Sequence, residues 1–206
     1  INYFDAGYAP PTNTTFALNL DAAQTPYTQQ DAFVLRVGVQ GYAVPDDQRP
    51  DANLYFVIDV SGSMDGGNRL GAVKSSLEAL IRSLRPTDTI GIVVYGSNGR
   101  VLLQPTPVAQ ADRILSAINQ LRPDGSTNAV EGLRLGYDMA NANFDPNRIN
   151  RIILCSDGVA NVGITDPQGI LETVREQAIE GINLTTVGFG MGNYNDVLME
   201  QLANDG

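Results

Sequence analysis

From Leu54 onward, short apolar runs alternate with longer segments in which apolar residues recur every three or four positions. The runs at 54–60 and 90–95 are almost continuously apolar, which is typical of strands buried on both faces of a parallel sheet. The segment between them, 70–84, has the period of an amphipathic helix. This alternation predicts an α/β fold, a doubly wound and mostly parallel sheet with right-handed helical crossovers.

The same periodicity assigns the rest of this region. Further helices are predicted at 109–121, 127–143 and 168–179, with the start of another at 196–202, and further strands at 101–103, 151–155 and 182–189. In doubly wound sheets, ligands bind outside the carboxyl ends of the strands. Residues that directly follow the predicted strands are therefore the candidates for function.

The first fifty residues have a different character, because they lack helical periodicity and are interrupted by prolines. Their clearest strand is predicted at 33–40, and a weaker one, with alternating apolar residues, at 15–20. We therefore expect a β-rich annex at 1–50, followed by a separate domain at 51–206.

Composition excludes several classes of function. The chain has no histidine and a single cysteine, Cys155, so neither a Ser-His-Asp triad, the usual catalytic zinc site nor an internal disulfide is expected. A formal net charge of -10 disfavours binding to nucleic acid or to an anionic membrane surface. Apolar runs have only strand length, so no membrane insertion is expected for this segment.

Small oxygen-bearing side chains follow three of the predicted elements. Asp59, Ser61 and Ser63 stand two positions apart, so their side chains can face one side if the backbone stays extended. Thr127 lies in a Gly-Ser-Thr loop before a predicted helix, and Asp157 directly follows the strand at 151–155. Since the carboxyl ends of parallel strands share one edge, Thr127 and Asp157 can converge on the same point as the serines.

Hydroxyls and carboxylates without nitrogen or sulfur suit a hard divalent cation, Mg²⁺ first and then Mn²⁺ or Ca²⁺. Mg²⁺ usually keeps several waters, so one position would be open to an acidic side chain of another molecule. Two simpler interpretations remain open at this point. Ser61 and Ser63 could form only a polar turn after a buried strand, and Thr127 could serve only as a helix cap.

Together, Asp59-x-Ser61-x-Ser63, Thr127 and Asp157 resemble the metal-ion-dependent adhesion site of the von Willebrand factor type A domain. The resemblance covers about Leu54 to the C-terminus. It implies that Ser61, Ser63 and Thr127 contact the metal directly, and that the two aspartates act mostly through water.

A second resemblance concerns the N-terminal part. The stretch 1–44 and the run 157–163 are similar to bacterial cell-envelope proteins that place a short β region ahead of the A domain. This similarity implies export, and thus an extracytoplasmic location in the cell envelope, the periplasm or the medium. Because family members usually continue with another strand and a C-terminal helix, we expect the domain at 51–206 to be truncated at its C-terminal end.

Two functions from different classes follow from these residues. The first is a binding module for adhesion or assembly, not an enzyme, in which bound Mg²⁺ accepts an Asp or Glu carboxylate from a partner protein. The alternative is a metal-dependent phosphoester hydrolase with Asp59 as nucleophile. That reaction needs a second acid or base two residues further on, where this chain has Ser61.

Overall fold

The structure is a computed structural model of the chain and describes residues 7–25, 32–45, 47–157, 167–190 and 196–206. The chain divides into two compact units, Ile1–Arg49 and Pro50–Gly206. The first unit contains an antiparallel ribbon of two strands, β1 (Phe16–Gln24) and β2 (Phe33–Gly41). The strands predicted at 15–20 and 33–40 are thus present, and pairing extends β1 to Gln24.

The ribbon has one apolar and one polar face. Directly opposed residues of an antiparallel pair share a face, and Leu18 opposes Val39 while Leu20 opposes Val37. These four side chains are all exposed. On the other face, the Arg36 guanidinium donates to Asp21 at 2.7 Å and lies 5.3 Å from the centroid of the Tyr8 ring, and the Tyr8 hydroxyl also donates to Asp21.

The second unit is built on a five-stranded sheet with the order β5-β4-β3-β6-β7. Its strands are β3 (Ala52–Asp59), β4 (Thr89–Tyr95), β5 (Gly99–Pro107), β6 (Ile149–Ser156) and β7 (Ile182–Gly188). Four strands run parallel, and β5 pairs antiparallel with β4 at one edge. The predicted α/β, doubly wound and mostly parallel sheet with a small N-terminal β annex is confirmed.

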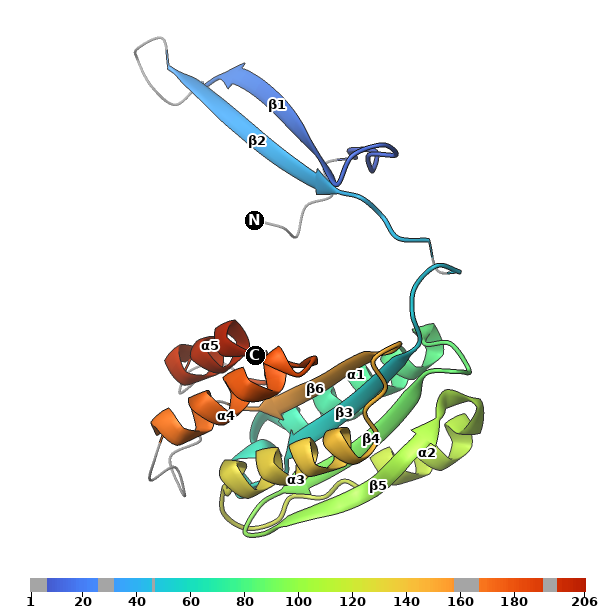
Figure 1. Cartoon of the computed structure of the whole chain (residues 1–206). Coiled ribbons are helices and arrows are strands. Elements are labelled where there is room, and N and C mark those ends of the chain that lie inside the picture. The colour runs from blue at the N-terminus through green and yellow to red at the C-terminus, as the bar shows by residue number, and fades with distance from the viewer. Residues whose placement is uncertain (1–6, 26–31, 46, 158–166, 191–195) are drawn as a thin grey trace. The chain divides into compact units, whose positions relative to one another are not determined.

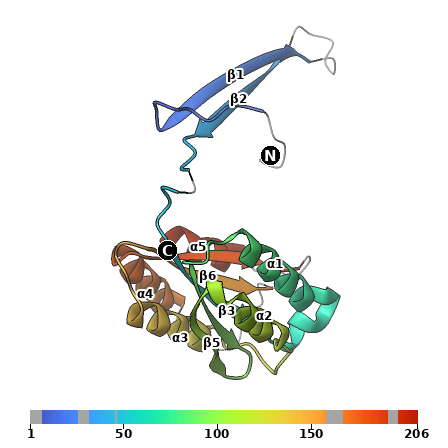
Figure 2. The same ribbon diagram turned by 90° about the vertical axis from the view of Figure 1, so that its right-hand side faces the viewer.

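Helices cover both faces of this sheet (Figure 1 and Figure 2). On one face lie α1 (Arg69–Ser83) and α2 (Ala111–Asn119), and on the other α3 (Ala129–Ala142), α4 (Pro167–Ile179) and α5 (Asp196–Asp205). Two 3₁₀ segments, η1 (Gly62–Asn68) and η2 (Val108–Gln110), precede α1 and α2. Among the described helices, none is long and apolar enough to cross a lipid bilayer.

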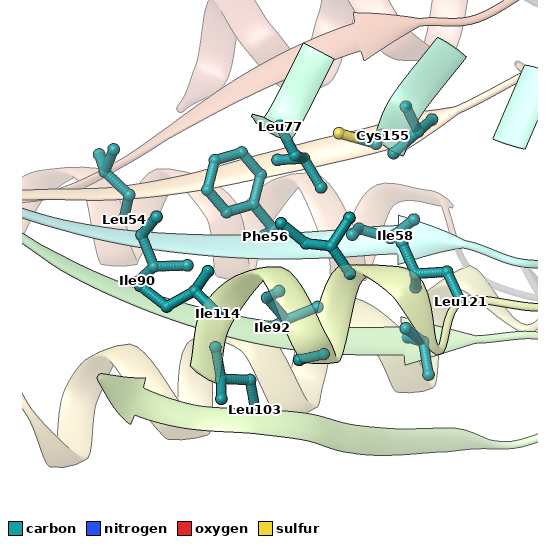
Figure 3. Close-up of a cluster of buried hydrophobic side chains, with 14 of the residues drawn as sticks. Leu54, Phe56, Ile58, Leu77, Ile90, Ile92, Leu103, Ile114, Leu121 and Cys155 are labelled. Carbon is teal, nitrogen blue, oxygen red and sulfur yellow. The ribbon is translucent and has the colours of Figure 1, made fainter. Parts of the chain in front are cut away.

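The core is organised around β3, which is buried along its whole length. Leu54, Phe56 and Ile58 alternate toward the face covered by α1 and α2, where Figure 3 shows them packed with Leu77 and other apolar side chains. The intervening Tyr55 and Val57 pack on the opposite face. This two-sided burial explains why the sequence of β3 is almost continuously apolar.

Most predicted elements match the structure within a few residues, and two differ. The helix predicted at 109–121 is shorter, because its first turn is the 3₁₀ segment η2. The strand predicted at 101–103 is part of the longer β5, whose pairing with β4 includes register shifts. Beyond Asp157, the run to 163 that contributes to the second resemblance lies outside the described residues.

Candidate metal site

Asp59 is the last residue of β3 and has no exposed surface. Its Oδ1 accepts a hydrogen bond from the Ser61 backbone N–H at 2.8 Å, and its Oδ2 accepts one from the Ser156 hydroxyl at 3.1 Å. Burial raises the pKa of the Asp59 carboxyl, hydrogen bonds from Ser61 and Ser156 oppose that shift, and the negative charge of Asp157 adds to it. A cation beside Asp59 would offset the cost of burying this charge.

The two serines follow as the chain leaves β3 and enters η1. Ser61 keeps an extended backbone, with φ -57° and ψ 163°, and its side chain is almost fully buried. The hydroxyl oxygens of Ser61 and Ser63 lie 3.0 Å apart. Neighbouring ligands of an octahedral Mg²⁺ with metal–oxygen distances of roughly 2.1 Å are about 3 Å apart, so this spacing fits two adjacent ligands of one ion.

Thr127 lies in a loop that contacts the serine loop through the backbone. The Gly62 N–H donates to the Gly125 carbonyl at 2.9 Å, and Gly125 has a φ of +68°, a conformation that favours glycine. Thr127 itself is 8% exposed. The N-cap of α3 is Asn128, whose side chain accepts from the Glu131 N–H, so the interpretation of Thr127 as the helix cap is wrong.

Asp157 follows β6, and its side chain is 1% exposed. Its Oδ2 accepts a hydrogen bond from Arg69 Nη1 at 2.6 Å, and the same nitrogen donates to the Ser63 carbonyl at 3.1 Å. One guanidinium nitrogen therefore joins the end of β6 to the serine loop. Arg69 was not predicted as a site residue, because the helix was expected to begin at Leu70 and the contact with Asp157 spans 88 positions of the chain.

The structure thus brings the loops of all five predicted residues together at the carboxyl ends of β3 and β6. Within the described part of the chain, no three histidine, cysteine, aspartate or glutamate side chains are grouped to hold a metal. An ion here would therefore depend on the hydroxyls as well as on the two carboxylates, which is a donor set that hard cations prefer. Metal coordination by Asp59, Ser61, Ser63, Thr127 and Asp157 stays a prediction.

Comparison with known proteins bears on the family. The chain is 38% identical over 191 residues to the uncharacterized protein YfbK of Escherichia coli, and the match covers 93% of this chain but only 33% of that relative. Its fold is similar to that of the manganese-loaded TRAP protein of Plasmodium vivax, with a TM-score of 0.63 and 24% identity over 75% of this chain and 63% of that one.

A second solved structure, an aerotolerance-related membrane protein from Bacteroides fragilis, has a TM-score of 0.60 and 16% identity over 75% of this chain and 87% of that one. A family model described as the von Willebrand factor type A domain matches residues 54–159, which include all five candidate residues. From this match, the shared fold and the doubly wound sheet, we conclude that the chain belongs to the von Willebrand factor type A domain family.

Proposed function

We propose that this chain is a divalent-metal-dependent protein-binding module for adhesion or assembly, in which bound Mg²⁺ accepts an Asp or Glu carboxylate from a partner protein. The observation that carries the proposal is the pair of Ser61 and Ser63 hydroxyls, 3.0 Å apart, next to the buried carboxylates of Asp59 and Asp157. A bound divalent cation would supply a positive charge with a coordination position open to an outside ligand.

The five candidate residues would have two different roles in metal binding. Ser61, Ser63 and Thr127 would bind the ion through neutral hydroxyls, which leave its charge available to a partner's carboxylate. Asp59 and Asp157 would contribute negative charge mostly through water. The hydrogen bonds that Asp59 accepts from Ser61 and Ser156 hold its carboxylate in place before any ion arrives. Mn²⁺ in the TRAP protein supports a divalent ion, and we propose Mg²⁺ for this chain.

The surroundings of Asp59 favour binding over hydrolysis. An aspartate nucleophile must reach its substrate directly, whereas Asp59 has no exposed surface. We therefore propose that the chain is not an enzyme. We also propose an extracytoplasmic location, which the resemblance to envelope proteins supports, as does the fold shared with a membrane protein of Bacteroides fragilis.

Metal binding can be measured by titration calorimetry with Mg²⁺ or Mn²⁺ after the protein has been treated with a chelator. We expect Ser61→Ala and Thr127→Ala each to weaken metal binding by at least about tenfold, because each removes one oxygen ligand. Folding should be almost unchanged, since neither hydroxyl belongs to the apolar core. Binding of a model carboxylate such as acetate should require the metal in the native chain.

The matched control is Ser83→Ala, because the Ser83 hydroxyl is exposed and donates to the Leu80 carbonyl of the same helix at 2.8 Å. This variant should bind metal as the native chain does. Native protein that takes up neither Mg²⁺ nor Mn²⁺ at millimolar concentration would refute the proposal. Release of phosphate from simple phosphoesters that disappears in Asp59→Asn would instead favour the hydrolase.

A further inference from the structure

Arg69 is the first residue of α1, and its side chain contacts two of the candidate site residues, Ser63 and Asp157. Nη1 donates to Asp157 Oδ2 at 2.6 Å and to the Ser63 carbonyl at 3.1 Å. The Arg69 side chain is 26% exposed and that of Asp157 is 1% exposed. The ion pair is thus largely removed from water. Charge interactions are stronger at such a buried position than at the surface.

The position of Arg69 in α1 does not favour helix stability. A positive charge in the first turn of a helix is opposed by the helix dipole, and α1 has no acidic residue in its first turn. Asn68, which precedes it, has a left-handed φ of 58° and makes no side-chain cap. The favourable interactions of Arg69 at this position are instead its contacts with Asp157 and Ser63.

A third segment encloses the guanidinium. Gly190, after β7, has a φ of +132°, and a Cβ built there would lie 2.7 Å from Arg69 Nε. The backbone at Gly190 can approach the guanidinium this closely because it has no side chain. Ser63, Asp157 and Gly190 therefore all lie against one cation.

We propose that Arg69 is a positioning residue that acts as a built-in counter-cation of the metal site, weakening metal binding and selecting an acidic ligand. This inference rests on the proposed function. The carboxylates of Asp59 and Asp157 together balance one divalent cation, so Arg69 gives the loaded site a net charge of about +1. A single carboxylate from a partner restores neutrality, whereas an uncharged or cationic group does not.

The same contact sets the behaviour of the protein without metal. With the cation absent, Arg69 provides the positive charge next to Asp157 and ties it to the serine loop. When a cation binds, it shares the site with this guanidinium, and the two positive charges repel each other. Arg69 therefore stabilises the metal-free protein more than the metal-loaded one.

The test uses the full chain and two variants, Arg69→Gln and Arg69→Lys, with Mn²⁺ affinity measured by calorimetry. Arg69→Gln should bind Mn²⁺ about tenfold more tightly, because the competing charge is gone. Arg69→Lys keeps the charge and should stay within about threefold of the native affinity. The control is Arg134→Gln, which removes an arginine from an exposed pair with Asp138, 62% and 61% exposed, and should leave Mn²⁺ binding unchanged.

Two further measurements, of Tm and of acetate binding, distinguish a counter-cation from a residue that only links two loops. In excess chelator, Arg69→Gln should have a lower Tm than the native chain, and saturating Mn²⁺ should remove most of the difference. Paramagnetic relaxation of acetate protons by the Mn²⁺-loaded protein should show acetate binding that is weaker by about threefold or more in Arg69→Gln.

Unchanged or weaker Mn²⁺ binding in Arg69→Gln would overturn the inference, and so would Mn²⁺ binding in Arg69→Lys that is as tight as in Arg69→Gln. Should Arg69→Gln not fold, the lysine variant still decides, because tighter Mn²⁺ binding there shows that charge is not what matters. If the native chain binds no Mn²⁺, the proposed function itself fails. The native titration therefore tells the two failures apart.

Discussion

Two fully buried aspartates lie at opposite ends of neighbouring strands, and their surroundings give them different roles. Asp59 ends β3, where its carboxylate accepts a hydrogen bond from the Ser156 hydroxyl and is influenced by the negative charge of Asp157. Asp88 precedes β4, and its oxygens accept hydrogen bonds from the backbone N–H groups of Ala52 and Arg85, both at 2.8 Å. Asp88 therefore joins the starts of β3 and β4, far along the strands from the candidate metal site.

Asp88→Ala is expected to lower the free energy of unfolding by about 3 kcal/mol, because it leaves two backbone N–H groups without their acceptor. Chemical denaturation measures this loss. Asp138→Ala is the control, since that carboxylate is 61% exposed and its removal should cost less than about 0.5 kcal/mol. Equal losses in the two variants would contradict the structural role of Asp88, and neither change should alter Mn²⁺ affinity.

The five candidate ligands could be named from the sequence, because each stands next to a predicted strand or helix, whereas Arg69 and Asp88 could not. Asp59, Ser61 and Ser63 were recognisable because an extended backbone places alternate side chains on one side. Arg69 reaches Asp157 across 88 positions, and no local pattern encodes a contact of that range. Asp88 looks like any polar residue before a strand until β3 is placed beside it.

At the scale of elements, the spacing of apolar residues in the sequence predicted the sheet and its helices but not the order of the strands. The order β5-β4-β3-β6-β7 depends on which strand edges pair through backbone hydrogen bonds, and every strand offers the same backbone groups for pairing. Helix α3 shows how closely such faces approach. A Cβ at Gly136 would lie 2.5 Å from Val57 of β3, and one at Gly132 would lie 2.5 Å from the Tyr95 ring of β4.

Gly136→Ala is therefore expected to destabilise the protein by about 2 kcal/mol, although alanine is the better helix former by roughly 1 kcal/mol. The added methyl group would push α3 away from the sheet, and Thr127 lies two residues before this helix. Thermal or chemical unfolding measures the cost. A matched change is Gly71→Ala in α1, where the three atoms nearest to the added Cβ all belong to the exposed side chain of Asn68, which can rotate away.

If packing against Val57 were loose, the two alanine variants would behave alike, and both would gain stability from helix propensity. A loss confined to Gly136→Ala would show that glycine is needed for the close approach of α3. The helix predicted at 127–143 is present at Ala129–Ala142. Its close approach to the sheet could not be predicted, because the glycines on its inner face contribute nothing to an apolar period.

At the scale of the whole molecule, the two units differ in how they bury apolar surface. Every residue in the two core clusters belongs to the unit Pro50–Gly206. The ribbon instead exposes its apolar face, with Leu18 at 61%, Leu20 at 66% and Val39 at 66%. An isolated two-stranded ribbon is marginally stable at best in water, so the fold of the second unit draws its stability from its own core.

A fragment comprising residues 50–206 is accordingly expected to fold alone, with a Tm within about 2 °C of that of the full chain and the same Mn²⁺ affinity. It should bind much less of an apolar dye such as anilinonaphthalene sulfonate, because the exposed apolar face is absent. The full chain with Leu18→Ser and Val37→Ser is the control, and it should lose dye binding without losing Tm. A fragment that melts more than about 5 °C lower would mean that the two units stabilise each other, and the ribbon would then have to be counted as part of the domain that carries the candidate metal site.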